Sequence, residues 1–324
     1  MEALALGPVR RLLGVNVDGW LAAGQATQHY RTFVDDAALR QLASWRLPHV
    51  RLPLELELLT AADGWRALDA ALMRCLRHEL TVMLALRVAD QAALFAAPGE
   101  WRTLGDAWRQ LAQRYRDSGV LFDLLDRPAP PGDVSEAALG DLGAPRLSAA
   151  AQRRAPAPGV AEARAWGALA TRLSQEVREV DPEAQLVVQA TGADPAAFSH
   201  LRPTRDPRTR YSFHLFAPPA LTQRGEGTYP GEVAGERWDR DRLAREIEPA
   251  LAFARNYEAQ LYLGAFGMTV KAPRAARLTW TRTVLSLCRT HGIGWAYWTY
   301  RHPDFGLAVE GAVDYDLLGV LQSE

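Results

Sequence analysis

Eight short apolar segments recur along the chain, and helix-like segments separate most of them. Most of the eight read as nearly continuous apolar runs of strand length, which is typical of strands that are covered on both faces in a parallel sheet. The eight segments are Leu12–Val17, His49–Pro53, Leu80–Leu86, Gly119–Leu125, Gln185–Ala190, Arg210–Phe216, Gln260–Ala265 and Ile293–Trp298.

The intervening segments repeat apolar residues at the spacing of one helix face. The clearest ones are Asp35–Trp45, Trp65–Arg77, Trp101–Tyr115, Val160–Val180, Asp239–Tyr257 and Pro273–His291. This alternation predicts an α/β fold, a closed (β/α)8 TIM barrel that forms a single domain over residues 1–324. A doubly wound open sheet is the alternative. Its nucleotide-binding form loses support because no Gly-x-Gly-x-x-Gly follows the first apolar run.

One long segment interrupts the alternation. Residues 129–159 are rich in Pro, Ala and Gly, and they follow the fourth apolar run. In a barrel they form a long loop at the C-terminal face, where active sites lie. A surface insertion is the simplest interpretation of this segment, and a lid or a docking loop for a protein partner is the alternative.

Charge and composition argue against several classes of function. The 37 Lys and Arg residues nearly balance the 38 Asp and Glu residues, so no basic excess indicates nucleic-acid binding. Two cysteines are too few for a disulfide framework or a four-thiolate zinc site, and the histidines lack a ligand spacing, so we expect no metal and no cofactor.

The sequence also bears on the membrane and on export. No apolar run reaches the ~18 residues of a membrane span, so we expect none. The first residues lack the order of a signal peptide, since their arginines follow the apolar run. As written, the chain is expected to be cytoplasmic; trimming of the N-terminus would make it a periplasmic or secreted protein.

Six motifs lie in order at the ends of the predicted strands. They are GVNVDGWL (14–21), VRLPLE (50–55), FDLLDRPAP (122–130), YSFHLFAP (211–218), LGAFG (263–267) and GWAYWTY (294–300). Together they resemble the strand-end motifs of the cellulase-type glycoside hydrolases of family 5, over roughly residues 12–320. The resemblance implies a TIM barrel that binds an oligo- or polysaccharide in a cleft at the C-terminal face.

Two departures from the family pattern change the expected chemistry. The resemblance places the general acid/base at Arg127, preceded by Asp126 instead of an asparagine, and the nucleophile at Ala265. Retaining hydrolysis needs two carboxylates about 5–5.5 Å apart. Alanine has no nucleophile, and arginine stays protonated near neutral pH. We therefore predict a pseudoenzyme that recognises a polysaccharide, in exopolysaccharide synthesis or export, without hydrolysing it.

Seven residues are expected to bind the glycan, and they are Asn16, Trp20, Arg51, Arg87, Arg127, His214 and Trp298. Three of them are arginines, and the two family glutamates are absent. Arginine matches carboxylate and phosphate oxygens, so we expect the cleft to prefer an acidic glycan. Local pairing of the arginines with Asp126 or Glu55 is the alternative, because unpaired buried charge is costly.

Two other functions stay open. A relocated carboxylate would restore an active hydrolase or transglycosylase; Asp126 is the leading candidate, and the others are Asp18, Glu55, Asp123 and Glu310. In the second alternative the barrel is an interaction scaffold in a polysaccharide-assembly complex, which contacts its partner through residues 129–159. The fold by itself does not choose between these functions.

Overall fold

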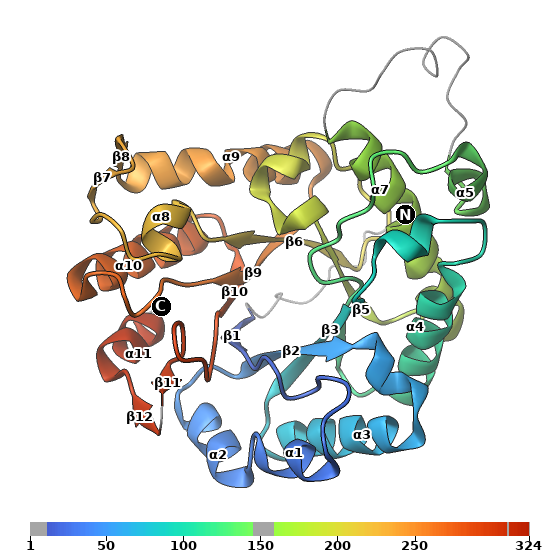
Figure 1. The fold of residues 1–324 in the computed structure, drawn as a ribbon, viewed down its shortest axis with the longest axis horizontal. Coiled ribbons are helices and arrows are strands. Elements are labelled where there is room, and N and C mark those ends of the chain that lie inside the picture. The colour runs from blue at the N-terminus through green and yellow to red at the C-terminus, as the bar shows by residue number, and fades with distance from the viewer. Residues whose placement is uncertain (1–11, 145–158, 310, 324) are drawn as a thin grey trace, which may run out of the picture.

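The computed structural model describes residues 12–144, 159–309 and 311–323. Eight parallel strands form its centre, and their bounds are β1 (Leu13–Asn16), β2 (His49–Glu55), β3 (Thr81–Arg87), β4 (Leu121–Asp123), β5 (Gln185–Gln189), β6 (Thr209–Leu215), β9 (Gln260–Phe266) and β10 (Gly294–Tyr297). They close into a barrel in the order β1-β10-β9-β6-β5-β4-β3-β2 (Figure 1). Each strand overlaps one of the eight apolar segments, so the prediction of a single-domain (β/α)8 TIM barrel is confirmed.

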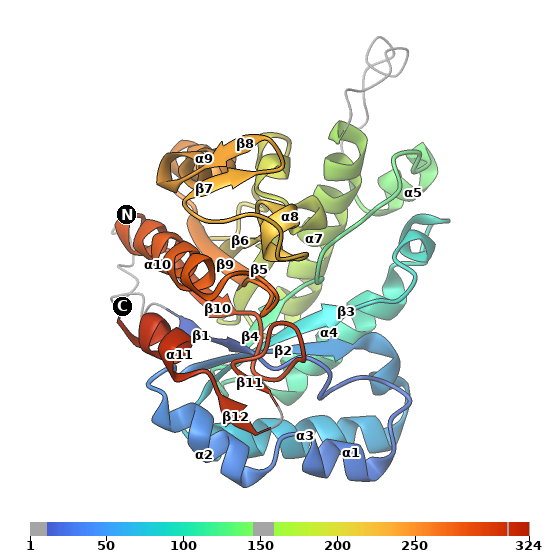
Figure 2. The same ribbon diagram turned by 60° about the vertical axis from the view of Figure 1, so that its left-hand side comes forward.

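Helices surround the barrel (Figures 1 and 2). The long ones coincide with the predicted helical segments and are α2 (Asp36–Ser44), α3 (Ala62–Arg77), α4 (Arg102–Arg114), α7 (Val160–Val180), α9 (Arg240–Tyr257) and α10 (Arg274–Thr290). The chain also forms shorter helices that the periodicity does not predict, namely α1 (Thr27–Thr32), α5 (Glu136–Asp141), α8 (Pro219–Thr222) and α11 (Tyr315–Gln322).

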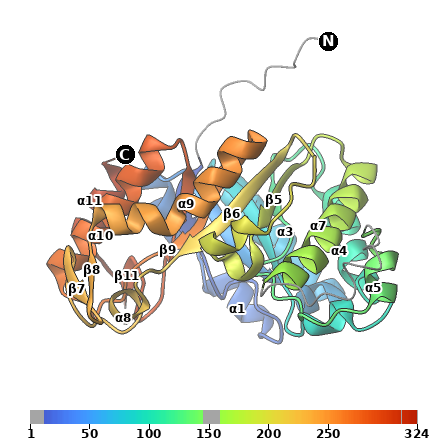
Figure 3. The ribbon, with the colours of Figure 1, turned by 90° about the horizontal axis from the view of Figure 1, so that it is seen from above.

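Two small hairpins lie in the loops that follow β6 and β10. They consist of β7 (Gly231–Val233) with β8 (Glu236–Trp238), and of β11 (Ala308–Val309) with β12 (Ala312–Val313). Figures 1 and 3 show the β7–β8 hairpin beside α9, and Figure 1 shows β11 beside α11. These strands are two or three residues long, which is too short for the apolar pattern of a sequence to reveal them.

Aspartates fix where several helices begin. The side chains of Asp35, Asp239 and Asp314 accept hydrogen bonds from backbone N–H groups in the first turns of α2, α9 and α11. Such an N-cap satisfies a donor that the helix itself leaves unpaired, and it contributes about 1 kcal/mol.

Buried tryptophans connect the helices to the barrel. The indole N–H of Trp108, on α4, donates to the Leu124 carbonyl at 2.9 Å, and that of Trp166, on α7, donates to the Gln189 carbonyl at 2.7 Å. Both acceptors lie at the carboxyl ends of strands β4 and β5. These bonds therefore hold in place the part of the barrel that carries the candidate site.

The two ends of the barrel interior differ in polarity. Met83, Leu121, Val187, Tyr262 and Ala296 form an apolar cluster inside the barrel. Further along the strands, toward their carboxyl ends, the buried side chains are polar, and they include Asn16, Arg51, Asp123 and Gln189. This polar layer forms the floor of the candidate site.

The long segment 129–159 is described only in part. Residues 129–144 include α5, while residues 145–158 of the proposed lid or docking loop lie outside the described residues. No helix in the described ranges is both long and apolar enough to cross a membrane.

Candidate functional site

Two adjoining hollows lie at the carboxyl ends of the barrel strands. Their volumes are about 730 Å³ and about 610 Å³, and Arg87, Asp126, Arg127 and Gly192 line both. We call the two hollows together the cleft. The second hollow also reaches His214, Ala265 and Trp298, so the cleft brings together most of the predicted site.

Arg51 is the centre of the polar layer below the cleft, and its side chain is fully buried. Its Nε and Nη2 atoms donate to Asp123 Oδ2 at 3.1 and 2.7 Å. Nη2 also donates to Asp126 Oδ1 at 2.6 Å, and Nη1 donates to Asn16 Oδ1 at 3.0 Å. The structure thus shows the local pairing that the sequence leaves open, with Asp123 as an additional partner.

Asn16 is also fully buried. Its amide nitrogen donates to the carbonyls of Gly264 at 2.9 Å and Ala296 at 3.2 Å, which tie β1 to its barrel neighbours. Neither Asn16 nor Arg51 lines the cleft. Asn16 ends β1, and Arg51 lies beside it in the register of β2. The polar layer uses their hydrogen-bonding groups, so neither side chain reaches the cleft in this structure, and their contact with the glycan stays a prediction.

Arg87 lies above this layer and reaches the cleft. Its Nε donates to Asp126 Oδ2 at 2.8 Å, and its Nη1 donates to Asp18 Oδ1 at 2.5 Å. Its guanidinium carbon lies 5.7 Å from the centroid of the Trp298 ring. Two carboxylates therefore neutralise Arg87, and Asp126 lies between two arginines.

The two aspartates of the layer have opposite protonation behaviour. Burial raises the pKa of Asp126, but the charges of Arg51 and Arg87 outweigh burial and hold that pKa well below its usual range. Burial raises the pKa of Asp123 to about 6, against the opposing charge of Arg51. Asp126 is thus a fixed anion near neutral pH.

Arg127 occupies the position that the resemblance assigns to the acid/base. Its side chain is exposed and lines both hollows. In the part of the chain that the structure describes, no carboxylate lies within 4.0 Å of it, so the predicted pairing with Asp126 or Glu55 does not form. Its φ of 52° is in the left-handed region, and its backbone N–H donates to Gln189 Oε1 at 3.0 Å.

Gln189 is a site residue that the sequence reasoning missed. Besides its bond to the Arg127 backbone, Gln189 binds both aspartates. Its Nε2 donates to Asp123 Oδ2 at 2.7 Å and to Asp126 Oδ1 at 3.2 Å. The available signal was a polar residue at the end of the apolar run 185–190.

Ala265 and His214 are register neighbours on β9 and β6. Ala265 is 1% exposed, and it lines the second hollow. His214 Nε2 lies 3.9 Å from Asp126 Oδ1, and it has no hydrogen-bond partner among the described residues. Burial lowers the pKa of His214 to about 3, so the imidazole is neutral. A Cβ at Gly264 would lie 3.1 Å from His214 Nε2, so only glycine leaves room for this ring.

The two tryptophans predicted to stack on sugars lie in different environments. Trp298 is partly exposed and lines the second hollow. Trp20 is fully buried, with its indole N–H donating to the Tyr30 carbonyl at 3.0 Å, so it does not reach the cleft in this structure, and its contact with the glycan stays a prediction. It is buried because the next residue, Leu21, bridges to Leu54 of β2, which draws this segment against the barrel.

Carboxylates outnumber cations in the cleft lining. Among the described lining residues, the two arginines are Arg87 and Arg127, and the carboxylates are Glu55, Glu57, Asp126, Asp194 and Glu246. Elsewhere in the lining, Phe216 and Phe305 contact each other edge to face, with 6.2 Å between ring centroids. Within the described ranges, no three His, Cys, Asp or Glu side chains gather as metal ligands would.

Comparison with known proteins gives a consistent result. The family described as "Cellulase (glycosyl hydrolase family 5)" matches residues 15–303. Endoglucanase C of Acetivibrio thermocellus is 22% identical, over 95% of this chain and 97% of that protein. Cellodextrinase A of Ruminococcus flavefaciens is 21% identical, over 86% of this chain and 82% of that protein.

Solved structures share the barrel. An endoglucanase structure superposes with a TM-score of 0.75 at 20% identity, covering 96% of this chain and 97% of that one. The clostridial cellulose synthase subunit Z (CcsZ) from Clostridioides difficile superposes with a TM-score of 0.73 at 19% identity, covering 96% and 99%. At these identities the structures establish the fold.

Proposed function

Because the chain belongs to the cellulase family, glycosyl hydrolase family 5, we propose that its cleft binds an uncharged glucan chain and does not hydrolyse it. The observation that carries this proposal is the pair of residues at the two positions where the family pattern has its catalytic glutamates. Arg127 and Ala265 both line the cleft, and neither supplies a carboxylate.

The chemistry of hydrolysis requires what these residues lack. Retaining glycosidases use one carboxylate as nucleophile and a second as the proton donor to the leaving oxygen. Proton transfer alone contributes about 10²–10⁴ in rate. The Ala265 methyl group offers no lone pair, and the Arg127 guanidinium keeps its protons.

Asp126 does not replace the missing acid in this proposal. A general acid must be protonated near the working pH, whereas the arginines around Asp126 keep its pKa well below the usual range. Both of its carboxylate oxygens are also engaged, since Oδ1 accepts from Arg51 and Oδ2 accepts from Arg87. A relocated mechanism would have to break two ion pairs before any proton moved.

Asp123 is an equally poor candidate, although its pKa of about 6 suits acid catalysis. It is fully buried beneath Arg51 and does not line the cleft. Of the other carboxylates named from the sequence, Asp18 pairs with Arg87 and Glu55 accepts from the Ala23 N–H at 2.7 Å. Glu310 lies outside the described residues.

The lining favours an uncharged glycan over an acidic one. Trp298 presents an aromatic ring on which a sugar can stack, and Phe216 and Phe305 add apolar surface. The acidic glycan predicted from the arginines has less support, since Arg87 is already neutralised and carboxylates outnumber arginines in the lining. Among the described lining residues, Arg127 is the one arginine without a carboxylate partner that a uronate could meet.

We place the protein with polysaccharide assembly rather than degradation, as a glucan-binding component. Its similarity to the cellulose synthase subunit Z supports this role, alongside the absent catalytic carboxylates. An interaction scaffold is compatible with the same role, and it predicts a protein partner that binds through residues 129–159.

Calorimetric titration with cellohexaose, and with hexagalacturonate of equal length, tests the proposal. The expected result is saturable binding of cellohexaose, weaker binding of hexagalacturonate, and no release of shorter sugars while a family endoglucanase digests the same sample. Equal or tighter binding of hexagalacturonate would restore the acidic-glycan interpretation. No binding of either sugar would overturn the proposal and leave the scaffold role.

A further inference from the structure

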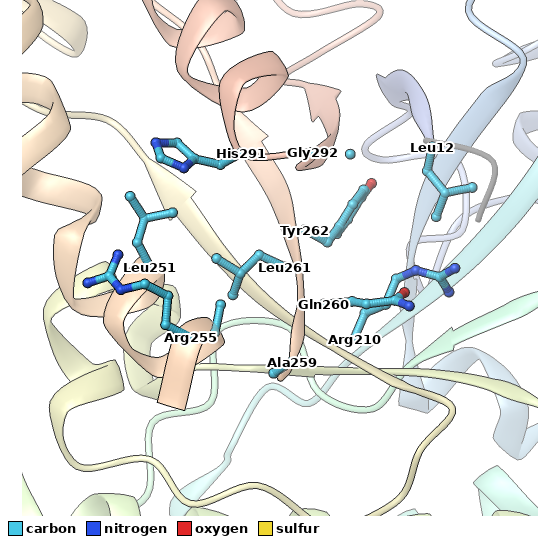
Figure 4. Close-up of a pocket in the computed structure, with 12 residues that line it drawn as sticks. Leu12, Arg210, Leu251, Arg255, Ala259, Gln260, Leu261, Tyr262, His291 and Gly292 are labelled. Carbon is cyan, nitrogen blue, oxygen red and sulfur yellow. The ribbon is translucent and has the colours of Figure 1, made fainter. Parts of the chain in front are cut away.

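A separate cavity of about 580 Å³ lies at the amino ends of the barrel strands, opposite the cleft. Its lining comes from the starts of β6, β9 and β10, from the end of α9 and from the turn after α10. Figure 4 shows Arg210 near Leu12 on one side, with Leu251, Arg255 and His291 on the other. Its volume is in the range of small-molecule sites.

Arg210 is the unusual residue in this lining. It is partly buried, yet in the described ranges no carboxylate lies within 4.0 Å of it. The other described arginines of similar or greater burial all have such a partner, and they are Arg51, Arg74, Arg87, Arg109, Arg164, Arg172, Arg178, Arg208, Arg242 and Arg277. Its Nη1 donates to Gln185 Oε1 at 3.0 Å, a neutral acceptor.

The surroundings give Arg210 no anion. Among the described residues the cavity is lined by three basic side chains, Arg210, Arg255 and His291, and by no carboxylate. The nearby Tyr262 hydroxyl lies 2.8 Å from His49 Nε2, and His49 Nδ1 donates to the Thr81 carbonyl, so that hydroxyl donates to His49. Burial accordingly lowers the pKa of Arg210, because nothing charged compensates its desolvation.

We propose that this cavity binds a small organic oxyanion, a carboxylate or phosphate carried on an apolar body. The oxyanion accepts from the free N–H groups of Arg210, whose planar fork fits two oxygens. The apolar body lies against Leu12, which lies on the same side of the cavity as Arg210. The site is independent of the glucan cleft, which lies at the other end of the barrel.

Calorimetric titration with hexyl phosphate, hexanoate and uncharged hexanol tests the site. We expect one of the two anions to bind and hexanol to bind at least about tenfold more weakly, since a charge-assisted hydrogen bond is lost. Arg210→Gln should weaken the anion at least about tenfold, while Arg245→Gln, an exposed arginine of α9, should not. Cellohexaose affinity should be the same in all three proteins.

A second variant keeps the test informative if Arg210→Gln folds poorly. Ala259→Glu places a carboxylate in the lining, so it should abolish anion binding while Arg210 is intact. Equal affinity of the anions in wild type, Arg210→Gln and Ala259→Glu would overturn the proposal, as would equal affinity for hexanol. An affinity for the added anion that is at least tenfold higher in Glu2→Gln than in the wild type would also overturn it. The chain's own carboxylate, not a small molecule, would then be the anion for the site.

Discussion

Replacing Arg51 by methionine tests the buried polar layer most sharply. Methionine keeps much of the side-chain volume and removes the charge. The variant leaves Asp123 and Asp126 as buried carboxylates without their main cation. Breaking a buried ion pair in this way costs about 3–5 kcal/mol in the free energy of unfolding. For a chain of 324 residues, whose unfolding entropy is about 0.7 kcal/mol/K, we expect the melting temperature to fall by about 4–7 °C.

Arg87→Met is the matched control. It removes the other arginine that pairs with Asp126, and the Arg87 side chain is more exposed than that of Arg51. The Arg87 side chain is 31% exposed, and that of Asp18 is 25% exposed, against 0% for Arg51 and for Asp123. Solvent weakens such a pair, so we expect a loss of about 1 kcal/mol. Urea denaturation of the three proteins at pH 7 gives the comparison.

The pH dependence separates electrostatics from packing. Without Arg51, the folded-state pKa of Asp123, already about 6, rises further above its unfolded value, while Arg87 still lowers that of Asp126. Groups with raised folded pKa values favour folding at low pH and lose that contribution as the pH rises. The deficit of Arg51→Met should therefore shrink when urea denaturation is repeated at pH 5. An equal deficit at both pH values, or a deficit no larger than that of Arg87→Met, would refute the reasoning.

Three further predictions address the cleft. Trp298→Ala should weaken cellohexaose binding about tenfold in calorimetric titration, whereas Tyr315→Ala, an exposed aromatic outside the cleft lining, should not change it. The double variant Arg127→Glu with Ala265→Glu should release reducing ends at least about 10²-fold faster than either single variant, because only the pair supplies both groups. His214 has a folded-state pKa of about 3 and ~6.5 when unfolded, so its contribution to stability is present above pH 6.5 and lost as the pH falls. Between pH 6 and 4, the free energy of unfolding of the wild type, measured by urea denaturation, should therefore fall by up to about 1.4 kcal/mol per pH unit more than that of His214→Gln. Equal slopes for the two proteins would contradict this.

The fold could be predicted because apolar runs and helical periodicity report burial directly. All eight barrel strands overlap predicted segments, and the six long helices do too. The short hairpins and α8 could not be predicted, since two to four residues carry no period.

The candidate site could be predicted in position but not in depth. Motif order places Asn16 and Arg51 on neighbouring barrel strands, yet it does not show that they belong to a buried polar layer below the cleft. Arg51 and Asp123 come from strands β2 and β4, and only the closure of the barrel brings them together. Trp20 shows the same limit, because its burial follows from a single bridge between Leu21 and Leu54.

The central claim is that a glucan bound in the cleft is not cleaved, because the residues at 127 and 265 supply no carboxylate. The most direct measurement is mass spectrometry of cellohexaose incubated with concentrated protein in ¹⁸O-labelled water. We predict intact cellohexaose and no label above the protein-free blank. Labelled cellobiose or cellotriose, formed in proportion to protein concentration, would contradict the account.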